Sequence, residues 1–159
     1  MNLYIDEAII ETKLNVADSA SVITEMGMKL LHAGLVQDNF IEAVIKREGV
    51  YPTGLPTSIP VALCHTDPEF VKCSFLTVAT LEKPVQFHEM GNPDNIQEVK
   101  IVFILGILDK DKHIDILKNI MKFIQSDRLL QLTYATESKL EIKKILLDNL
   151  MPVALEERT

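Results

Sequence analysis

The stretch from Val99 to Ile107 is the feature that most restricts how this chain can fold. Only Lys100 and Gly106 interrupt its apolar character. A strand with one solvent-facing side alternates apolar and polar residues, whereas a strand covered on both faces by helices is apolar almost throughout. The apolar segment here is also far too short to cross a bilayer as a helix. It therefore predicts a buried strand inside an α/β layered fold.

Two helical patterns come early in the chain. The first opens at Asp18, a residue suited to cap a helix, and closes at Gly34; the second opens at Asp38 and ends at Gly49. The inward positions are Val22, Ile23, Met26, Leu30 and Ala33 in the first helix and Phe40, Ile41, Val44 and Ile45 in the second. These two segments are predicted to form an antiparallel helical pair.

Strand patterns replace the helical ones after Gly49. The segment Gly49–Pro60 is rich in Gly, Pro, Ser and Thr and predicts a loop, and it leads into a short apolar strand at Val61–Leu63. Phe70–Leu81 alternates in the manner of a half-buried strand, and Val85–Phe87 suits another short strand. A turn is expected at Gly91–Asn95.

Helical patterns return after the long apolar strand. Asp111 is expected to cap a helix, a short helix follows at Leu129–Ala135, and Ser138 with Glu141 forms the pattern of a capping box for the last helix. The inward positions are Ile114, Leu117, Met121 and Ile124 in the first of these helices and Ile142, Ile145, Leu146 and Leu150 in the last. The order predicts an α/β sandwich with a mixed central β-sheet flanked by helices on both faces, as a single domain over residues 1–159.

Composition restricts the partners. The net charge is −7 and the basic residues form no stripe, which disfavours binding to DNA or RNA. The only cysteines, Cys64 and Cys73, form no CxxC pair or disulfide framework. The N-terminal residues MNLYIDEAIIETK lack the basic start and apolar core of a signal peptide. We therefore expect a cytoplasmic protein with no membrane insertion, no metal and no cofactor.

His65 is the histidine with the most informative position. It follows the strand Val61–Leu63 almost directly and precedes Thr66, Asp67 and Pro68, which do not easily continue a sheet. A side chain at the end of a buried strand is held firmly yet faces solvent, and α/β folds place reactive groups there. His32 and His88 stand at a helix end and beside a loop, where a histidine usually has no special role.

Arg47 and His113 are the other candidates, although each also has an ordinary interpretation as a surface residue. Arg47 lies near the end of the second helix, just before the loop that leads to His65. His113 is expected in the first turn of its helix. There the helix dipole favours a neutral imidazole, and backbone N–H groups can donate hydrogen bonds to an anion.

Together, these three residue types suggest phosphoryl transfer. Unperturbed imidazole has a pKa of about 6.5, so it is largely neutral and nucleophilic near pH 7. It attacks phosphorus without a metal or a separate base. A guanidinium and a second imidazole suit stabilisation of the phosphoryl oxygens. That His65, Arg47 and His113 converge in space is a hypothesis at this point.

Two other kinds of site use the same segment. A Cys/His pair of Cys64 and His65 is disfavoured because neighbouring strand residues point to opposite faces. A zinc site of Cys64, His65 and Asp67 lacks a well-spaced fourth ligand.

A longer motif surrounds His65. It begins with Arg47-Glu48-Gly49-Val50-Tyr51-Pro52-Thr53-Gly54 and ends with Ile59-Pro60-Val61-Ala62-Leu63-Cys64-His65. This block resembles the active-site region of the fructose–mannitol type of enzyme IIA from bacterial sugar phosphotransferase systems, and Tyr-Pro-Thr-Gly-Leu-Pro is closest to the galactitol-type branch. The resemblance extends over essentially the whole chain. One departure is Cys64, since the family commonly has proline before its histidine.

The resemblance implies a phosphocarrier without a cofactor. In such a protein, His65 accepts a phosphoryl group on Nε2 from the phosphohistidine carrier protein and donates it to a cysteine of enzyme IIB during sugar import. Arg47 matches the stabilising arginine of the family and His113 its second active-site histidine. The enzyme IIA fold is the predicted sandwich.

Two alternatives remain open on the sequence. A regulatory relative would use the phosphorylation state of His65 to control its binding to a target protein. A plain interaction domain with a decayed site would not be phosphorylated at all.

Overall fold

The computed structural model describes residues 3–151. Within this range the chain forms five strands, five α-helices and three short 3-10 turns. In chain order these are η1 (Glu7–Ile9), β1 (Glu11–Leu14), α1 (Ser19–His32), α2 (Phe40–Val50), β2 (Gly54–Leu55), β3 (Val61–His65), η2 (Pro68–Phe70), β4 (Phe75–Glu89), β5 (Asn92–Gly106), η3 (Asp111–His113), α3 (Ile114–Ile124), α4 (Asp127–Ala135) and α5 (Lys139–Leu150).

The strands form one mixed sheet. β5 pairs antiparallel with β4 and parallel with β3. β1 runs parallel to β4, while β2 pairs antiparallel with β3 and contacts the far end of β4 at the bridge between Gly54 and Glu89. The parallel register between β3 and β5 places His65 opposite Leu105. The carboxyl ends of these two strands therefore lie at the same edge of the sheet.

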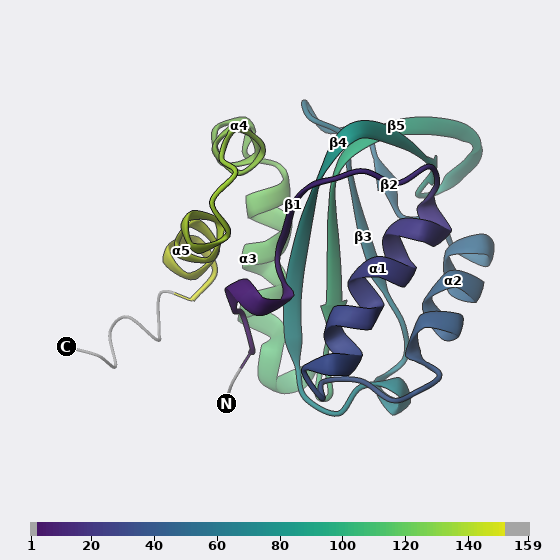
Figure 1. Ribbon diagram of the computed structural model, residues 1–159, viewed down its shortest axis with the longest axis vertical. Coiled ribbons are helices and arrows are strands. Elements are labelled where there is room, and N and C mark those ends of the chain that lie inside the picture. The colour runs from purple at the N-terminus through teal and green to yellow at the C-terminus, as the bar shows by residue number, and fades with distance from the viewer. Residues whose placement is uncertain (1–2, 152–159) are drawn as a thin grey trace.

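Helices cover both faces of this sheet (Figure 1). α1 and α2 pack on one face against Val102 and Ile104 of β5, and α3, α4 and α5 pack on the other against Ile101, Phe103 and Leu105. The whole segment from Ile101 to Ile107 is buried. The predicted two-sided burial of this strand and the sandwich architecture are confirmed. None of the helices in residues 3–151 has the length and apolar character needed to cross a bilayer.

The helix ends follow local chemistry in part. The Asp18 carboxylate accepts the Ser21 N–H at 2.8 Å and caps α1, and Gly34 after that helix has a φ of +74°. The Ser138 hydroxyl accepts the Glu141 N–H at 3.1 Å, as predicted. A capping box also needs a second hydrogen bond, from the Ser138 N–H to the Glu141 side chain. That part of the prediction is wrong, because the Ser138 N–H donates to the Thr136 hydroxyl.

Several predicted boundaries are wrong. The segment Phe70–Leu81 is not one strand: β4 begins at Phe75 and continues through Val85–Phe87 to Glu89. β4 and β5 form one long hairpin, since β5 already begins at Asn92. Alternation failed as a guide because β4 lies inside the sheet and is buried on both faces over its first seven residues.

Two helices also differ from their predicted form. α2 begins at Phe40 after Asn39, not at Asp38, and continues through Gly49 to Val50. The inward side of α3 comprises Ile116, Ile120, Phe123 and Ile124. The predicted inward residues Ile114 and Met121 are exposed, because Asp111 opens a 3-10 turn rather than the α-helix and so shifts the face of the helix.

Candidate functional site

The carboxyl ends of β3 and β5 bring the candidate residues to one edge of the sheet. His65 is the last residue of β3, and β5 ends one residue beyond its partner Leu105. The loop after β3 carries Thr66 and Asp67, and the loop after β5 leads through Lys110 to His113. Parallel strands end on the same side of a sheet, so these two loops are neighbours.

The ring of His65 is oriented by its own strand. Its Nδ1 lies 3.2 Å from the carbonyl oxygen of Leu63. A carbonyl only accepts, so Nδ1 carries the hydrogen, and in the neutral ring Nε2 is left with a free lone pair. The sequence therefore places a side chain at the strand end, and the backbone of the same strand selects its tautomer.

The surroundings keep His65 neutral. Partial burial lowers the pKa of His65 below its usual value, and the positive charges of Arg47 and Lys110 lower it further. The hydrogen bond to Leu63 and the charge of Asp67 oppose this shift. The net result is a ring that is a nucleophile rather than a cation near neutral pH.

His65 lines a hollow of about 280 Å³. Its wall is formed by Leu63, His65, Thr66, Pro68, Leu105, Ile107, Lys110 and Leu117. The wall is largely apolar, and the ammonium group of Lys110 is its one permanent charge. Such a lining strengthens electrostatic interactions with an anion that enters it.

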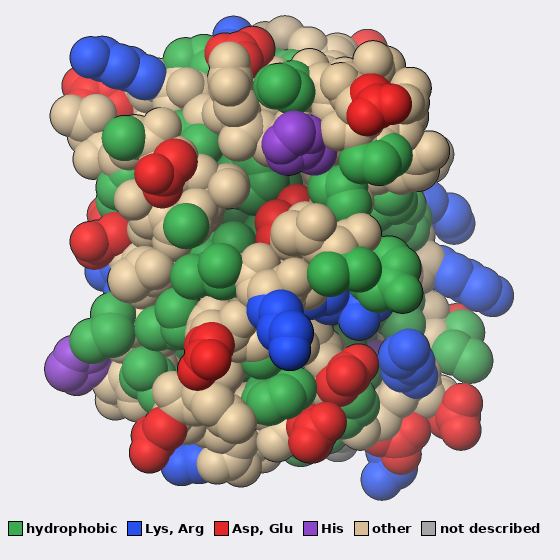
Figure 2. All heavy atoms as spheres, turned by 90° about the vertical axis from the view of Figure 1, so that its right-hand side faces the viewer, with side chains coloured by type: hydrophobic (Ala, Val, Ile, Leu, Met, Phe, Trp, Pro, Cys, Tyr) green, Lys and Arg blue, Asp and Glu red, His purple; other side chains and the backbone are tan. Residues whose placement is uncertain are grey.

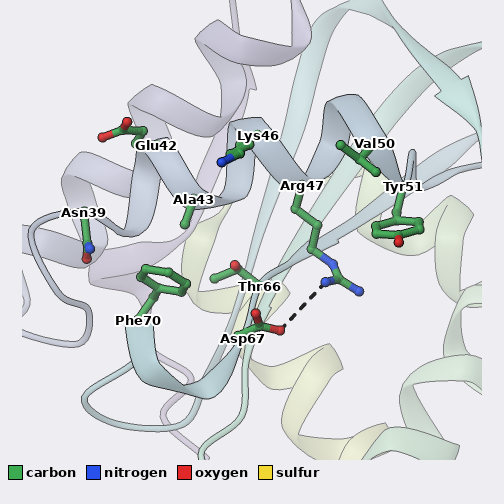
Figure 3. A pocket seen from close by; sticks show the side chains of 10 residues that line it. All are labelled: Asn39, Glu42, Ala43, Lys46, Arg47, Val50, Tyr51, Thr66, Asp67 and Phe70. Atoms are coloured by element: carbon green, nitrogen blue, oxygen red, sulfur yellow. Dashed lines mark ion pairs between the residues drawn. The ribbon is translucent and has the colours of Figure 1, made fainter.

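Arg47 lies in an adjoining groove of about 430 Å³, which contains Thr66 and Asp67 in its wall (Figure 3). Thr66 lines both hollows, so the guanidinium and His65 belong to one continuous surface. Arg47 Nη1 lies 3.8 Å from a carboxylate oxygen of Asp67, and the guanidinium lies 5.3 Å from the centre of the Tyr51 ring. The ion pair is longer than a hydrogen bond, and the buried Nε has no hydrogen-bond partner within residues 3–151. The guanidinium therefore retains donors for an anion.

His113 does not line either of these hollows. It is the residue directly before α3, where its Nδ1 lies 3.0 Å from the carbonyl oxygen of Asp109. The sequence placed His113 in the first turn of the helix, with a surface histidine as its ordinary interpretation. The structure instead has it before the helix, with a buried side chain whose Nε2 has no partner among the described residues. The structure thus brings His65 and Arg47 onto one surface, whereas His113 lies outside both hollows, on the loop that carries Lys110.

Cys64 faces away from His65. It is fully buried among the apolar residues that pack under α1 and α2, and burial raises the pKa of its thiol well above the ordinary value. Leu63, on the other side, belongs to the cluster under α3, α4 and α5. The structure therefore agrees with the sequence argument against a Cys/His pair. Within residues 3–151, no group of three or more His, Cys, Asp or Glu residues is placed to hold a metal ion.

Lys110 is the site residue that the sequence argument missed. It lies between Asp109 and Asp111 in a loop, where a lysine is ordinary. The one signal that points to it is its place a few residues after the long apolar strand, on the same edge as His65.

The surface around α2 combines charged and exposed apolar side chains. Figure 2 shows this side of the molecule, where basic side chains gather near the middle beside exposed hydrophobic ones, with acidic side chains around them. Val50 and Tyr51 at the end of α2 are more than 60% exposed, at 62% and 64%. Both side chains line the same groove as Arg47.

The chain matches known proteins over nearly its whole length. The family model for "Phosphoenolpyruvate-dependent sugar phosphotransferase system, EIIA 2" matches residues 3–149. The galactitol-specific EIIA component of the PTS system from Escherichia coli (strain K12) is 25% identical over 136 residues, which cover 85% of this chain and 89% of that protein.

Two solved structures share the fold. The complex of enzyme IIA and phosphorylated enzyme IIB of the mannitol system from Escherichia coli matches with a TM-score of 0.74 and 19% identity, over 92% of this chain and 99% of that one. The nitrogen regulatory protein IIA-Ntr from Neisseria meningitidis matches with a TM-score of 0.69 and 20% identity, over 89% and 94% of the two chains. Because the family model covers residues 3–149 of the 159, the chain belongs to the EIIA 2 family of the phosphoenolpyruvate-dependent sugar phosphotransferase system.

Proposed function

We propose that this protein is a cytoplasmic phosphocarrier of a sugar phosphotransferase system. His65 accepts a phosphoryl group from the phosphohistidine carrier protein and passes it to a cysteine of enzyme IIB, which phosphorylates the sugar on import. Arg47 and His113 stabilise the phosphoryl oxygens. No metal or cofactor takes part in these steps.

The observation that carries this proposal is the contact between His65 Nδ1 and the Leu63 carbonyl oxygen, which lie 3.2 Å apart. With its hydrogen on Nδ1 and bonded to the Leu63 carbonyl, the ring presents a free lone pair on Nε2. That lone pair forms the new bond to phosphorus while the bond from phosphorus to the donor's histidine nitrogen breaks and the donor keeps the electron pair. The ring becomes positively charged, and the Leu63 carbonyl stabilises that charge. Transfer to a cysteine thiolate of enzyme IIB returns the ring to its neutral form.

The charges around His65 fit the other half of the reaction. Phosphoryl transfer needs little covalent chemistry from a protein beyond positioning and stabilisation of charge on the equatorial oxygens. The Arg47 guanidinium has free donors, and Lys110 adds a second positive charge in the hollow beside the ring. Both also keep His65 neutral before it reacts.

The relatives favour a galactitol-type transport system. The curated relative is a galactitol-specific component, and the Tyr51-to-Pro56 segment is the part of the motif nearest to that branch. The mannitol IIA forms a complex with phosphorylated IIB, and we propose the matching partner here. The surface around Val50 and Tyr51, next to Arg47, is the proposed contact area.

The test is incubation with phosphoenolpyruvate, enzyme I and the phosphohistidine carrier protein, followed by intact mass measurement. A gain of one phosphoryl group that is lost in acid is expected, because a phosphoryl group bound to nitrogen is labile. Later addition of the matching enzyme IIB should remove that gain. A chain that never gains mass would contradict the proposal.

A regulatory role is the second candidate, favoured by the fold shared with the nitrogen regulatory protein IIA-Ntr. It uses the same phosphorylation of His65 but predicts no transfer to an enzyme IIB. Genes for enzymes IIB and IIC beside this one support transport, and their absence supports regulation.

We expect the phosphorylation rate to rise with pH and to level off near neutrality. Only the neutral ring is nucleophilic, and it prevails above the pKa of His65. Because that pKa lies below its ordinary value, the midpoint of the rise falls below about pH 6.5. Single-turnover rates between about pH 5 and pH 8, compared with an NMR titration of His65, check this. A rate that still climbs well above neutrality would contradict it.

His113→Ala is expected to slow phosphoryl transfer by about a hundredfold, the lower range for loss of one stabilising donor. The buried Nε2 has no hydrogen-bond partner among the described residues. In the imidazolium form of the ring it is the donor left for a phosphoryl oxygen, because Nδ1 is bound to the Asp109 carbonyl. The rate should be measured well below the unfolding temperature of the variant, because removing a buried ring also opens a cavity. His113→Gln, which keeps an N–H donor, serves as the matched control and should retain more of the rate.

A further inference from the structure

We propose that Glu48 is a positioning residue for phosphoryl transfer: its carboxylate holds Thr53, and Thr53 fixes the Leu63 peptide that orients the ring of His65. This inference rests on the proposed function of His65. Glu48 follows Arg47 in the last turn of α2, so one turn of helix carries both the group that faces the anion and the group that supports the nucleophile.

The first step is the bond between Glu48 and Thr53. One carboxylate oxygen accepts the Thr53 N–H at 2.8 Å and the other accepts the Thr53 hydroxyl at 2.8 Å. Thr53 is buried, with 3% of its surface exposed. Both oxygens are used, so the carboxylate fixes the backbone and the side chain of the same residue.

The second step runs from Thr53 through Leu63 to His65. The Thr53 carbonyl accepts the Leu63 N–H at 3.4 Å, and the Leu63 carbonyl accepts the hydrogen of His65 Nδ1 at 3.2 Å. Both backbone polar groups of Leu63 are thus bound: its N–H donates to Thr53, and its carbonyl accepts from the ring of His65. A shift of Thr53 tilts the acceptor that selects the tautomer of His65.

The surrounding structure makes Thr53 sensitive to its partner. The next residue, Gly54, lies so close to β4 that an added Cβ would stand 2.7 Å from the His88 carbonyl oxygen, and the Gly54 carbonyl accepts the Met90 N–H at 2.8 Å. The loop is therefore held on its β4 side by backbone contacts and on its α2 side by Glu48. Loss of the Glu48 bonds frees only the α2 side of the loop. Thr53 and its hydrogen bond to Leu63 can then shift without unfolding of the loop.

The electrostatic surroundings of Glu48 agree with a role in positioning the loop rather than in stabilising the fold. Burial raises the pKa of Glu48, which shows that desolvation disfavours the charged form, and the two bonds from Thr53 oppose that shift. A partly buried carboxylate that has to be held in this way stabilises the fold only weakly. Its two bonds do give the loop a defined position, and precise placement of a reacting group strongly affects a transfer rate.

The experiment compares Glu48→Gln, Thr53→Val and Thr53→Ser with the matched control Glu25→Gln, which changes an exposed glutamate on α1. Glu48→Gln keeps nearly the same shape but replaces one carboxylate oxygen by an NH₂ group. This group would then face the N–H or the hydroxyl of Thr53, which are both donors to Glu48. We expect its single-turnover transfer rate to fall by about tenfold or more, the usual scale for a supporting contact. Thr53→Val should fall less because the N–H bond remains, and Thr53→Ser and Glu25→Gln should stay within about twofold.

The second readout is the tautomer of His65, followed by the ¹⁵N chemical shifts of its ring in unphosphorylated protein. The native chain should show hydrogen on Nδ1, and Glu48→Gln should shift the ring toward a mixture. A merely structural role would lower the unfolding temperature without moving these shifts. Combining Glu48→Gln with Thr53→Val should add little further loss, since both act through one path.

The outcomes separate this inference from the proposed function. If Glu48→Gln leaves both the rate and the ring shifts unchanged while the native chain is phosphorylated, the positioning role is wrong and the phosphocarrier stands. If the native chain is never phosphorylated, the phosphocarrier fails, and the ring shifts still test the link from Glu48 to His65.

Discussion

His65→Ala is expected to abolish phosphorylation of this protein by the phosphohistidine carrier protein. The variant keeps Arg47 and Lys110 in place but lacks the Nε2 lone pair that forms the bond to phosphorus. No neighbour replaces it: Cys64 is fully buried on the other face of β3 and its raised pKa keeps it a thiol. The intact mass of His65→Ala should stay unshifted under conditions in which the native chain is fully converted.

The control for this result is His32→Ala, which removes an exposed histidine at the end of α1. That variant should gain one phosphoryl group at the native rate. His65→Ala should remain folded because the ring is only partly buried and its one hydrogen bond is local, to a residue two positions away. A phosphoryl group on folded His65→Ala would mean that another residue is the acceptor and would contradict the assignment.

Arg47→Ala is expected to slow phosphoryl transfer by about a hundredfold to a thousandfold, the cost of removing one strong charge-stabilising donor. The nucleophile remains, so the protein should still reach full phosphorylation when given time. Arg47→Lys should lie between the two because lysine keeps the charge but loses the planar fork that matches phosphoryl oxygens. Single-turnover rates measured by rapid quench are the appropriate readout.

Arg47→Ala is expected to lose transfer rate without losing stability. The ion pair of Arg47 with Asp67 spans 3.8 Å, and the two side chains are 33% and 64% exposed. Surface pairs of this kind contribute little to stability. Unfolding of Arg47→Ala should therefore match the control Arg128→Ala, which changes an exposed arginine on α4.

A second, independent sign of the Arg47 effect is the pKa of His65. The positive charge of Arg47 contributes to lowering that pKa, so its removal should raise the pKa toward the ordinary value. An NMR titration of His65 in Arg47→Ala measures this shift. An unchanged pKa together with an unchanged rate would remove Arg47 from the site.

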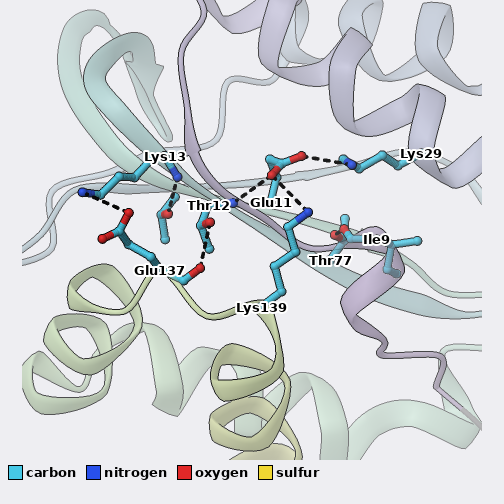
Figure 4. Close-up of polar contacts among 9 residues, drawn as sticks. Ile9, Glu11, Thr12, Lys13, Lys29, Thr77, Glu137 and Lys139 are labelled. Carbon is cyan, nitrogen blue, oxygen red and sulfur yellow. Dashed lines mark hydrogen bonds and ion pairs between the residues drawn. The ribbon is translucent and has the colours of Figure 1, made fainter.

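The N-terminal segment illustrates what local patterns do not predict. No local pattern predicted η1 or the edge strand β1, which pairs with the first half of β4. β1 is held by contacts with residues far away in the chain (Figure 4): Glu11 forms ion pairs with Lys29 of α1 at 3.0 Å and Lys139 of α5 at 3.3 Å. Lys13 adopts a φ of +51°, and its N–H donates to the Thr80 hydroxyl at 3.1 Å. Four residues of mixed polarity become a strand only because a neighbouring strand and two helices are already in place.

The sequence by itself determined the layers of the fold and the central site residues. The apolar segment Val99–Ile107 requires cover on both faces, and the helical periods before and after it supply that cover. The motif from Arg47 to His65 also pointed to the proposed nucleophile and its proposed arginine, because spacing along one helix, one loop and one strand is encoded locally.

Only the tertiary structure decided how these groups act on one another. The parallel register of β3 and β5 brings Lys110 to His65 and buries His113 beneath the surface, and packing of α2 against the β2 loop connects Glu48 to the Leu63 peptide. These contacts join residues that are far apart in the chain, and no repeating pattern in the sequence indicates that such residues will meet. The sequence thus determines that a histidine ends this strand, whereas the fold decides its tautomer, its pKa and the charges that surround it.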